Sequence, residues 1–153
     1  MAALSRAKNK VFLSHSAKDR KLVVRLASIL DRSGMPYWYS ATHILGAKQW
    51  HDETGRALAR CNWFLVALTP DSVRSQWVKR ELLFALNEER YHERIIPLLY
   101  KKCNSSQLSW TLPEYEFVDF TGDFEAGCRR LLRIWKIMYK PISSAKGRPK
   151  KRR

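Results

Sequence analysis

The sequence predicts an α/β fold in which a mainly parallel sheet is covered by helices on both faces. Short apolar runs of strand length alternate with longer segments whose apolar residues recur at helical spacing. Residues 63–68, WFLVAL, are apolar almost without interruption, which is typical of a strand buried on both faces. The length of 153 residues suits one domain.

The first part of the chain supplies two strands and one helix. Residues 11–13 predict a buried strand, and the polar sequence SHSAKD after them predicts a loop. From residue 19, apolar side chains recur every three or four positions as far as Gly34, a common helix stop. Pro36 lies at the start of the next expected strand, residues 35–39, where a missing amide donor is tolerated.

The central part begins with a long loop. Residues 40–49 have no sustained periodicity, and loops of this length are often functional. A helix is expected at 50–60, before the strand at 63–68, and Ser75 fits the N-cap of a helix that continues to about residue 87. The remaining expected elements are strands at 94–99 and 116–119, a loop at 100–112 between them, and a last helix at about 124–138.

In a parallel sheet the ligand site lies at the carboxyl ends of the strands, near a switch in strand order. Three segments are expected to meet there: the loop after residue 13, the loop at 40–49, and the turn at 69–75. The last of these leads into SQWVKREL, in which Trp77 and Glu81 stand one helical turn apart on one face. The helix must roll Glu81 toward the sheet edge if this acid is to face the crevice.

Several classes of site are not indicated. The three cysteines, Cys61, Cys103 and Cys128, are widely spaced and form no CxxC pair, and no two histidines have metal-ligand spacing, so we expect no metal. The chain has no GxGxxG, GxxxxGK or GxSxG sequence. A phosphoacceptor receiver would need acidic residues after the first strand, where this chain has Ser-His-Ser.

The net charge of +15 is unevenly spread, with nearly half of it in a short C-terminal tail. Residues 140–153 hold seven basic residues and no acid, and we expect residues 139–153 to be disordered. The sequence GRPKKRR resembles a minor-groove AT-hook, so weak nucleic-acid contact and a merely solvated tail are the alternatives. No apolar stretch is long enough for a signal peptide or a membrane span, which predicts a cytoplasmic protein without membrane contact.

Four segments together resemble a TIR (Toll/interleukin-1 receptor) domain of the bacterial stand-alone type. They are VFLSHSAKD at 11–19, the glycine-containing loop before Trp50, FLVALTPDSVRSQWVKREL at 64–82, and RIIPLL at 94–99. The resemblance covers residues 8–138 and implies a flavodoxin-like fold of five parallel strands. Thr69 stands where the family usually has serine.

The resemblance implies one of two functions. Enzymatic TIR domains cleave NAD+ at the nicotinamide–ribose bond to give ADP-ribose or a cyclic isomer, and others are assembly modules. It assigns Glu81 as the catalytic residue, with NAD+ as substrate, no cofactor, and a role in bacterial anti-phage signalling. It also implies self-association with other TIR protomers, or a partner protein encoded separately.

The expected site residues are as follows. The candidate substrate-binding residues are Ser14, His15, Ser16, Trp38, Lys48, Trp50 and Trp77, and the candidate self-association residues are Thr42, His43, Ile44, Leu45 and Gly46. Alternatives stay open for several of them. His15 can be an ordinary loop histidine, Lys48 and Trp50 can be surface residues, Trp77 can be sheet–helix packing, and Glu81 can be an acid paired with Lys79 or Arg80. The family's usual Asp after the second strand is Ser40 here, and the basic residues that some members carry in the first loop are replaced by His15 and Ser16.

The chemistry fits a single carboxylate. Neutral nicotinamide is a good leaving group, so the bond to ribose needs little acid catalysis. The demanding step is stabilisation of a ribosyl cation, which one carboxylate can supply electrostatically or through the ribose hydroxyls. Trp77 offers a flat apolar wall for nicotinamide or ribose.

Overall fold

The computed structural model describes residues 9–39 and 47–141, together with the side chains of all of these except residues 47–50. Within these ranges, no helix combines the length and the apolar composition that a membrane crossing requires. The predicted loop at 40–49, the predicted tail at 139–153 and the predicted start of the domain at residue 8 lie wholly or partly outside the described residues.

The centre of the molecule is a five-stranded sheet in which every pairing is parallel. The strands are β1 (Val11–Ser14), β2 (Tyr37–Tyr39), β3 (Trp63–Leu68), β4 (Ile95–Leu99) and β5 (Val118–Asp119), arranged in the order β2-β1-β3-β4-β5. The chain runs outward from β1 to β2 and then returns to place β3 on the other side of β1. The switch point for ligand binding therefore lies between the carboxyl ends of β1 and β3. The predicted flavodoxin-like fold is confirmed.

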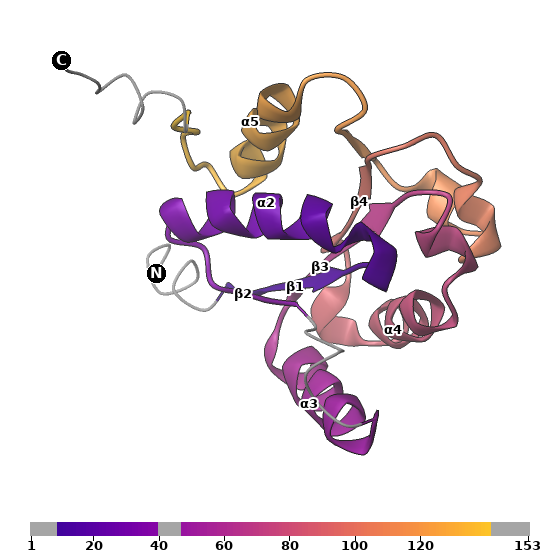
Figure 1. The fold of residues 1–153 in the computed structure, drawn as a ribbon. Coiled ribbons are helices and arrows are strands. Elements are labelled where there is room, and N and C mark those ends of the chain that lie inside the picture. The colour runs from indigo at the N-terminus through magenta and orange to yellow at the C-terminus, as the bar shows by residue number, and fades with distance from the viewer. Residues whose placement is uncertain (1–8, 40–46, 142–153) are drawn as a thin grey trace, which may run out of the picture.

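Helices cover both faces of the sheet (Figure 1). Helices α2 (Arg20–Arg32) and α5 (Phe124–Ile134) lie on one face, and α3 (Ala47–Arg60) and α4 (Gln76–Leu86) lie on the other. Short 3-10 helices complete the connections: η1 (Ala17–Asp19), η2 (Ser72–Arg74), η3 (Glu89–Tyr91), η4 (Ser105–Gln107) and η5 (Leu112–Glu114).

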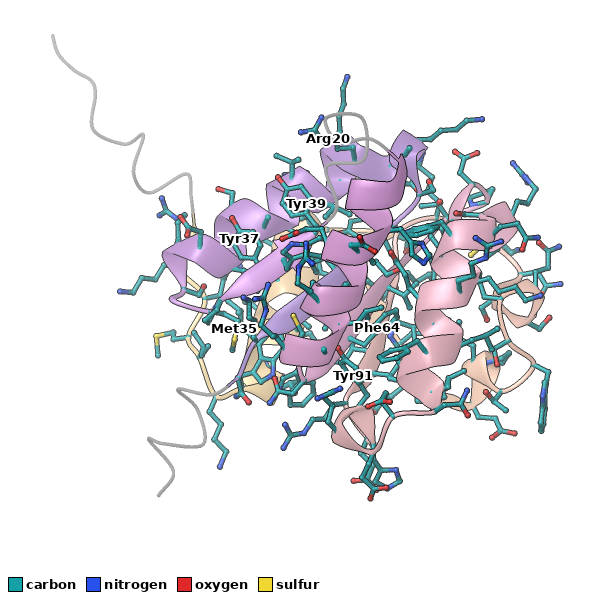
Figure 2. The ribbon with its side chains drawn as sticks, turned by 90° about the horizontal axis from the view of Figure 1, so that it is seen from below. Arg20, Met35, Tyr37, Tyr39, Phe64 and Tyr91 are labelled. Atoms are coloured by element: carbon teal, nitrogen blue, oxygen red, sulfur yellow. The ribbon has the colours of Figure 1, made fainter. Side chains whose placement is uncertain are left out.

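Each face of the sheet has its own apolar core because strand side chains alternate in direction. Val11 and Leu13 pack into the cluster under α2 and α5, whereas Phe12 packs into the cluster under α3 and α4. In that second cluster Phe64 meets Tyr91 edge to face at 6.1 Å, and Figure 2 shows this pair between the α3 and α4 ribbons. Strand β1 is thus buried on both sides, and its last residue emerges at the switch point.

Three predicted boundaries were wrong by about two to four residues. Helix α3 begins at Ala47, so residues 47–49, which were predicted to belong to the 40–49 loop, are helical. Strand β2 begins at Tyr37 because Met35 still completes the turn that ends α2, donating from its amide to the Leu30 carbonyl. Helix α5 ends at Ile134, short of the predicted residue 138, because Lys136 adopts a left-handed φ of 59°.

Candidate functional site

Most of the buried polar side chains gather at one place in the fold. Eight polar or charged residues are buried among those described, and six of them lie at the carboxyl ends of β1 and β3 or in the segments that pack there. We call these six the polar cluster: Ser14, Ser16, Asp19, Thr69, Ser72 and Glu81. Because buried polar groups are costly unless paired, such a concentration at the switch point indicates a functional site.

Glu81 reaches this site from α4. Ser75 caps that helix, accepting a hydrogen bond from the Val78 amide, as the sequence predicted. Glu81 shares the buried face of α4 with Val78 and Leu82 and is only 4% exposed. Its Oε1 accepts a 2.6 Å hydrogen bond from the Ser14 hydroxyl at the end of β1. The helix therefore does roll Glu81 toward the sheet edge.

This placement rejects one of the alternatives for Glu81. The acid is not a surface carboxylate paired with a neighbouring cation, since it is buried while Lys79 and Arg80 are exposed. The sequence correctly placed Trp77 and Glu81 on one helical face. It did not indicate that Ser14 would donate directly to the acid.

Burial raises the pKa of Glu81 to about 8. Hydrogen bonding from the Ser14 hydroxyl and from the Trp77 side chain acts in the opposite direction, because both donors favour the ionised acid. Removal from water is the larger effect. A carboxyl group held in this way next to a switch point has the electrostatic character of many catalytic acids and bases.

Trp77 lies in the first turn of α4 and is half-buried. Its ring meets that of the exposed His51 on α3 edge to face, with 5.4 Å between the centroids. The tryptophan thus bridges α3 and α4 beside Glu81. This position is compatible both with helix packing and with a wall of the site, so its contact with substrate stays a prediction.

Asp19 is the residue that sequence reasoning missed. It was assigned only to the start of a helix, yet it is 3% exposed and joins two loops. Its Oδ2 accepts one hydrogen bond from the Ser16 hydroxyl at 2.8 Å and another from the Thr69 hydroxyl at 2.5 Å. The spacing Ser-x-x-Asp directly after a buried strand could have signalled a side-chain bridge within the loop.

The structure also places the other candidate site residues of the first loop. Ser14 and Ser16 are buried, and their hydroxyls serve Glu81 and Asp19. His15 lies between them with Nδ1 2.7 Å from the Ser16 carbonyl oxygen and its ring 6.0 Å from that of Tyr39. Whether these residues contact NAD+ stays a prediction.

The remaining predicted residues divide into two groups. Trp38 is half-buried and stacks on Phe12 with 5.1 Å between ring centroids, so at least part of it belongs to the core under α3 and α4. Lys48 and Trp50 fall within α3, but their side chains are outside the described part of the structure. The predicted self-association residues 42–46 also lie outside it. Among the described residues, no group of three or more His, Cys, Asp or Glu side chains is arranged to hold a metal ion.

Two solved structures have the same fold as this chain. The TIR domain of the Toll-related Receptor TRR-2 from Hydra magnipapillata matches with a TM-score of 0.67 and 20% identity, covering 82% of this chain and 96% of that one. The TIR domains of the activated Roq1 resistosome, which directly recognises the pathogen effector XopQ, match with a TM-score of 0.64 and 16% identity, covering 82% and 98%.

One curated relative is a bacterial protein. The 2' cyclic ADP-D-ribose synthase BtTIR of Bacteroides thetaiotaomicron is 27% identical over 92 residues, which are 59% of this chain. The match spans only about a third (32%) of the length of that relative. The family model described as TIR domain matches residues 11–132, which include all five strands and the whole polar cluster. The chain belongs to the TIR domain family.

Proposed function

We propose that this TIR domain cleaves NAD+ at the nicotinamide–ribose bond, giving ADP-ribose or a cyclic ADP-ribose isomer. One observation carries the proposal: the buried carboxyl group of Glu81 is held by Ser14 at the carboxyl edge of the sheet. The name of the Bacteroides relative, a synthase of a cyclic ADP-ribose, supports the same class of substrate.

The proposed chemistry uses the charge of the substrate. The ribosyl C1′–nitrogen bond breaks, and its electron pair leaves with the nitrogen, so the pyridinium becomes neutral nicotinamide. Positive charge then develops on the ribose, where ionised Glu81 stabilises it. In the free protein burial keeps the pKa of Glu81 near 8, and the cationic ring of bound NAD+ lowers this pKa because it favours the carboxylate. Substrate binding thus prepares the acid for its role.

The second step decides the product. Attack by water at C1′ releases a proton and gives ADP-ribose, whereas attack by a nucleophile of the same molecule closes a ring. In both cases the carboxylate holds the cationic intermediate and forms no obligatory covalent bond. The position of the attacking group relative to C1′ selects between the two outcomes.

The test compares nicotinamide release by three proteins at saturating NAD+. Glu81→Gln keeps the shape of the side chain but removes the charge, and we expect turnover to fall by roughly 10²- to 10³-fold, as for other transition-state stabilisers. Glu89→Gln is the matched control. It makes the same chemical change at an exposed residue in η3, which is not part of the polar cluster. Undiminished release by Glu81→Gln would reject the catalytic assignment.

The second candidate function is a non-enzymatic interaction module. Trp110 is 80% exposed, and with the exposed Leu83 it borders a surface hollow of about 620 Å³, which favours a protein contact. The TIR domains that share this fold in the second solved structure belong to a resistosome that directly recognises a pathogen effector. In this case purified protein would release no nicotinamide even when forced to cluster, and phage challenge would not depend on Glu81.

Self-association and the immune role belong to the same proposal. Replacement of Gly46 by tryptophan tests whether residues 42–46 join protomers, read out as the oligomer distribution in solution. We expect fewer oligomers with an unchanged melting temperature. An unchanged distribution would favour assembly through a separately encoded partner.

A further inference from the structure

Two independent connections join β1 to helix α4. The first is the direct hydrogen bond from Ser14 to Glu81. The second runs through Asp19, which accepts from Ser16 in the loop after β1 and from Thr69 just after β3. Both connections are buried, so solvent does not compete for these hydrogen bonds.

Thr69 passes the second connection on to α4. Its hydroxyl donates to Asp19 and also accepts from the Ser72 amide at 3.1 Å. In the opposite direction, the Thr69 amide donates a 3.0 Å hydrogen bond to the Ser72 hydroxyl oxygen. Ser72 begins η2, and only Ser75, the N-cap, separates η2 from the first turn of α4. The turn before α4 is therefore fixed at both of its ends.

The carboxylate of Asp19 is suited to holding this turn in one position. It sits at the N-terminus of α2, where backbone amides favour negative charge, and a single oxygen receives both hydroxyl donors. An apolar residue here would hold the loops only by contact. A shared acceptor also fixes their direction, because each hydroxyl must point at the same oxygen.

We infer that Asp19 is a positioning residue: by linking the loop after β1 to the turn before α4 through Thr69, it holds Glu81 against Ser14. Its catalytic meaning rests on the proposed function. Loss of this link lets α4 shift relative to β1, which lengthens the Ser14–Glu81 hydrogen bond and admits water to the acid.

The experiment compares Thr69→Val with Thr69→Ser. Valine has nearly the shape of threonine but no hydroxyl, whereas serine keeps the hydroxyl and loses only a methyl group. We expect Thr69→Val to lower kcat by about tenfold or more with little change in KM, since Glu81 acts in the transition state. Thr69→Ser restores kcat to near the parent value. Equal kcat values for the two variants would overturn the inference, as would a rise in KM alone.

A second readout does not need activity. In each background, the melting temperature is compared with that of the same protein carrying Glu81→Gln, at about pH 5 and about pH 8. The difference in melting temperature between each protein and its Glu81→Gln form changes with pH because of Glu81. We expect this change to shrink by roughly half in Thr69→Val, because water now reaches the acid, and to persist in Thr69→Ser. Nearby titrating groups, His15 and Asp19 beside β1 and His51 on α3, are present in both members of each pair, so their contributions cancel.

The two readouts separate this inference from the proposed function. If the parent protein releases no nicotinamide but the pH-dependent difference still shrinks in Thr69→Val, the positioning role stands and the proposed function fails. If Thr69→Val does not fold, Asp19→Asn replaces it, since the amide lacks the charge that holds both hydroxyls. An unchanged difference in the folded variant would show that Asp19 acts only on the local fold.

Discussion

The two buried carboxyl groups at the carboxyl edge of the sheet have opposite surroundings. Asp19 accepts hydrogen bonds from two hydroxyls and lies at the N-terminus of a helix. Glu81 is equally buried but lies beside apolar residues of α4, and burial raises its pKa to about 8. The first acid is matched to its site, so it stabilises the loops. The second is held in an unfavourable site, which is typical of a group kept for chemistry.

The largest expected effect is on stability at alkaline pH. Since the folded-state pKa of Glu81 is raised above its ordinary value of 4.5, this acid is neutral in both folded and unfolded states at low pH. Between about pH 4.5 and pH 8 only the unfolded chain ionises, so the free energy of unfolding falls as pH rises. Glu81→Gln removes this loss. We therefore expect the free energy of unfolding of the variant, measured against that of the parent, to increase by on the order of 4 kcal/mol between pH 4 and pH 8.

Chemical denaturation of the parent and Glu81→Gln across this pH range checks the prediction. The two curves should run together at low pH apart from a constant offset, and separate as the pH rises. Glu89→Gln, on an exposed acid, should follow the parent throughout. Curves that stay parallel would mean that Glu81 is solvated, and the contrast between the two acids would disappear.

Asp19→Asn is expected to have the opposite sign and a smaller size. The amide keeps an oxygen acceptor but loses the charge that strengthens both hydroxyl hydrogen bonds, so the protein should lose about 1–2 kcal/mol. The same denaturation experiment measures it near pH 7. A stabilising effect would show that Asp19, like Glu81, is a poorly matched buried acid.

Helix ends show how far sequence patterns could predict the fold. Helices α2 and α5 finish with the same hydrogen bonds: the Met35 amide bonds to the Leu30 carbonyl in one, and the Ile137 amide bonds to the Leu132 carbonyl in the other. The left-handed residue is Gly34 in the first, and the glycine marked that end correctly. In the second it is Lys136, which carries no such signal, so the predicted helix continued too far.

The site was predictable where helical spacing determined it. Four-residue spacing placed Trp77 and Glu81 on one face, and the predicted catalytic role of Glu81 came from the family resemblance. The contacts of Ser14 with Glu81 and of Thr69 with Asp19 span 67 and 50 residues. A hydrogen bond between a hydroxyl and a carboxyl group far apart in the sequence leaves no periodic pattern. Nothing in the local sequence distinguishes such a serine or threonine from one on the surface. Only the assembled sheet brings them together.

Ser14→Ala should shift the titration of Glu81 by a moderate amount. The Ser14 hydroxyl favours the ionised acid, so its loss raises the pKa of Glu81 further. We expect the alkaline loss of stability to grow by about 1 kcal/mol and the pH profile of nicotinamide release to move to higher pH. Ser33→Ala is the control, since its hydroxyl bonds to the Ile29 carbonyl at the other end of α2. A shift of equal size in that variant would mean that the effect is not specific to Glu81.

The smallest effect is expected from Trp77→Phe, which keeps an aromatic face and removes the indole N–H. Hydrogen bonding from Trp77 is the smallest of the three contributions to the pKa of Glu81, so loss of the indole N–H should raise this pKa only slightly. The ring is half-buried. If it forms a wall of the site, KM for NAD+ should rise by about threefold while the melting temperature changes little. A fall in melting temperature with unchanged KM would instead assign Trp77 to the packing of α4 against α3.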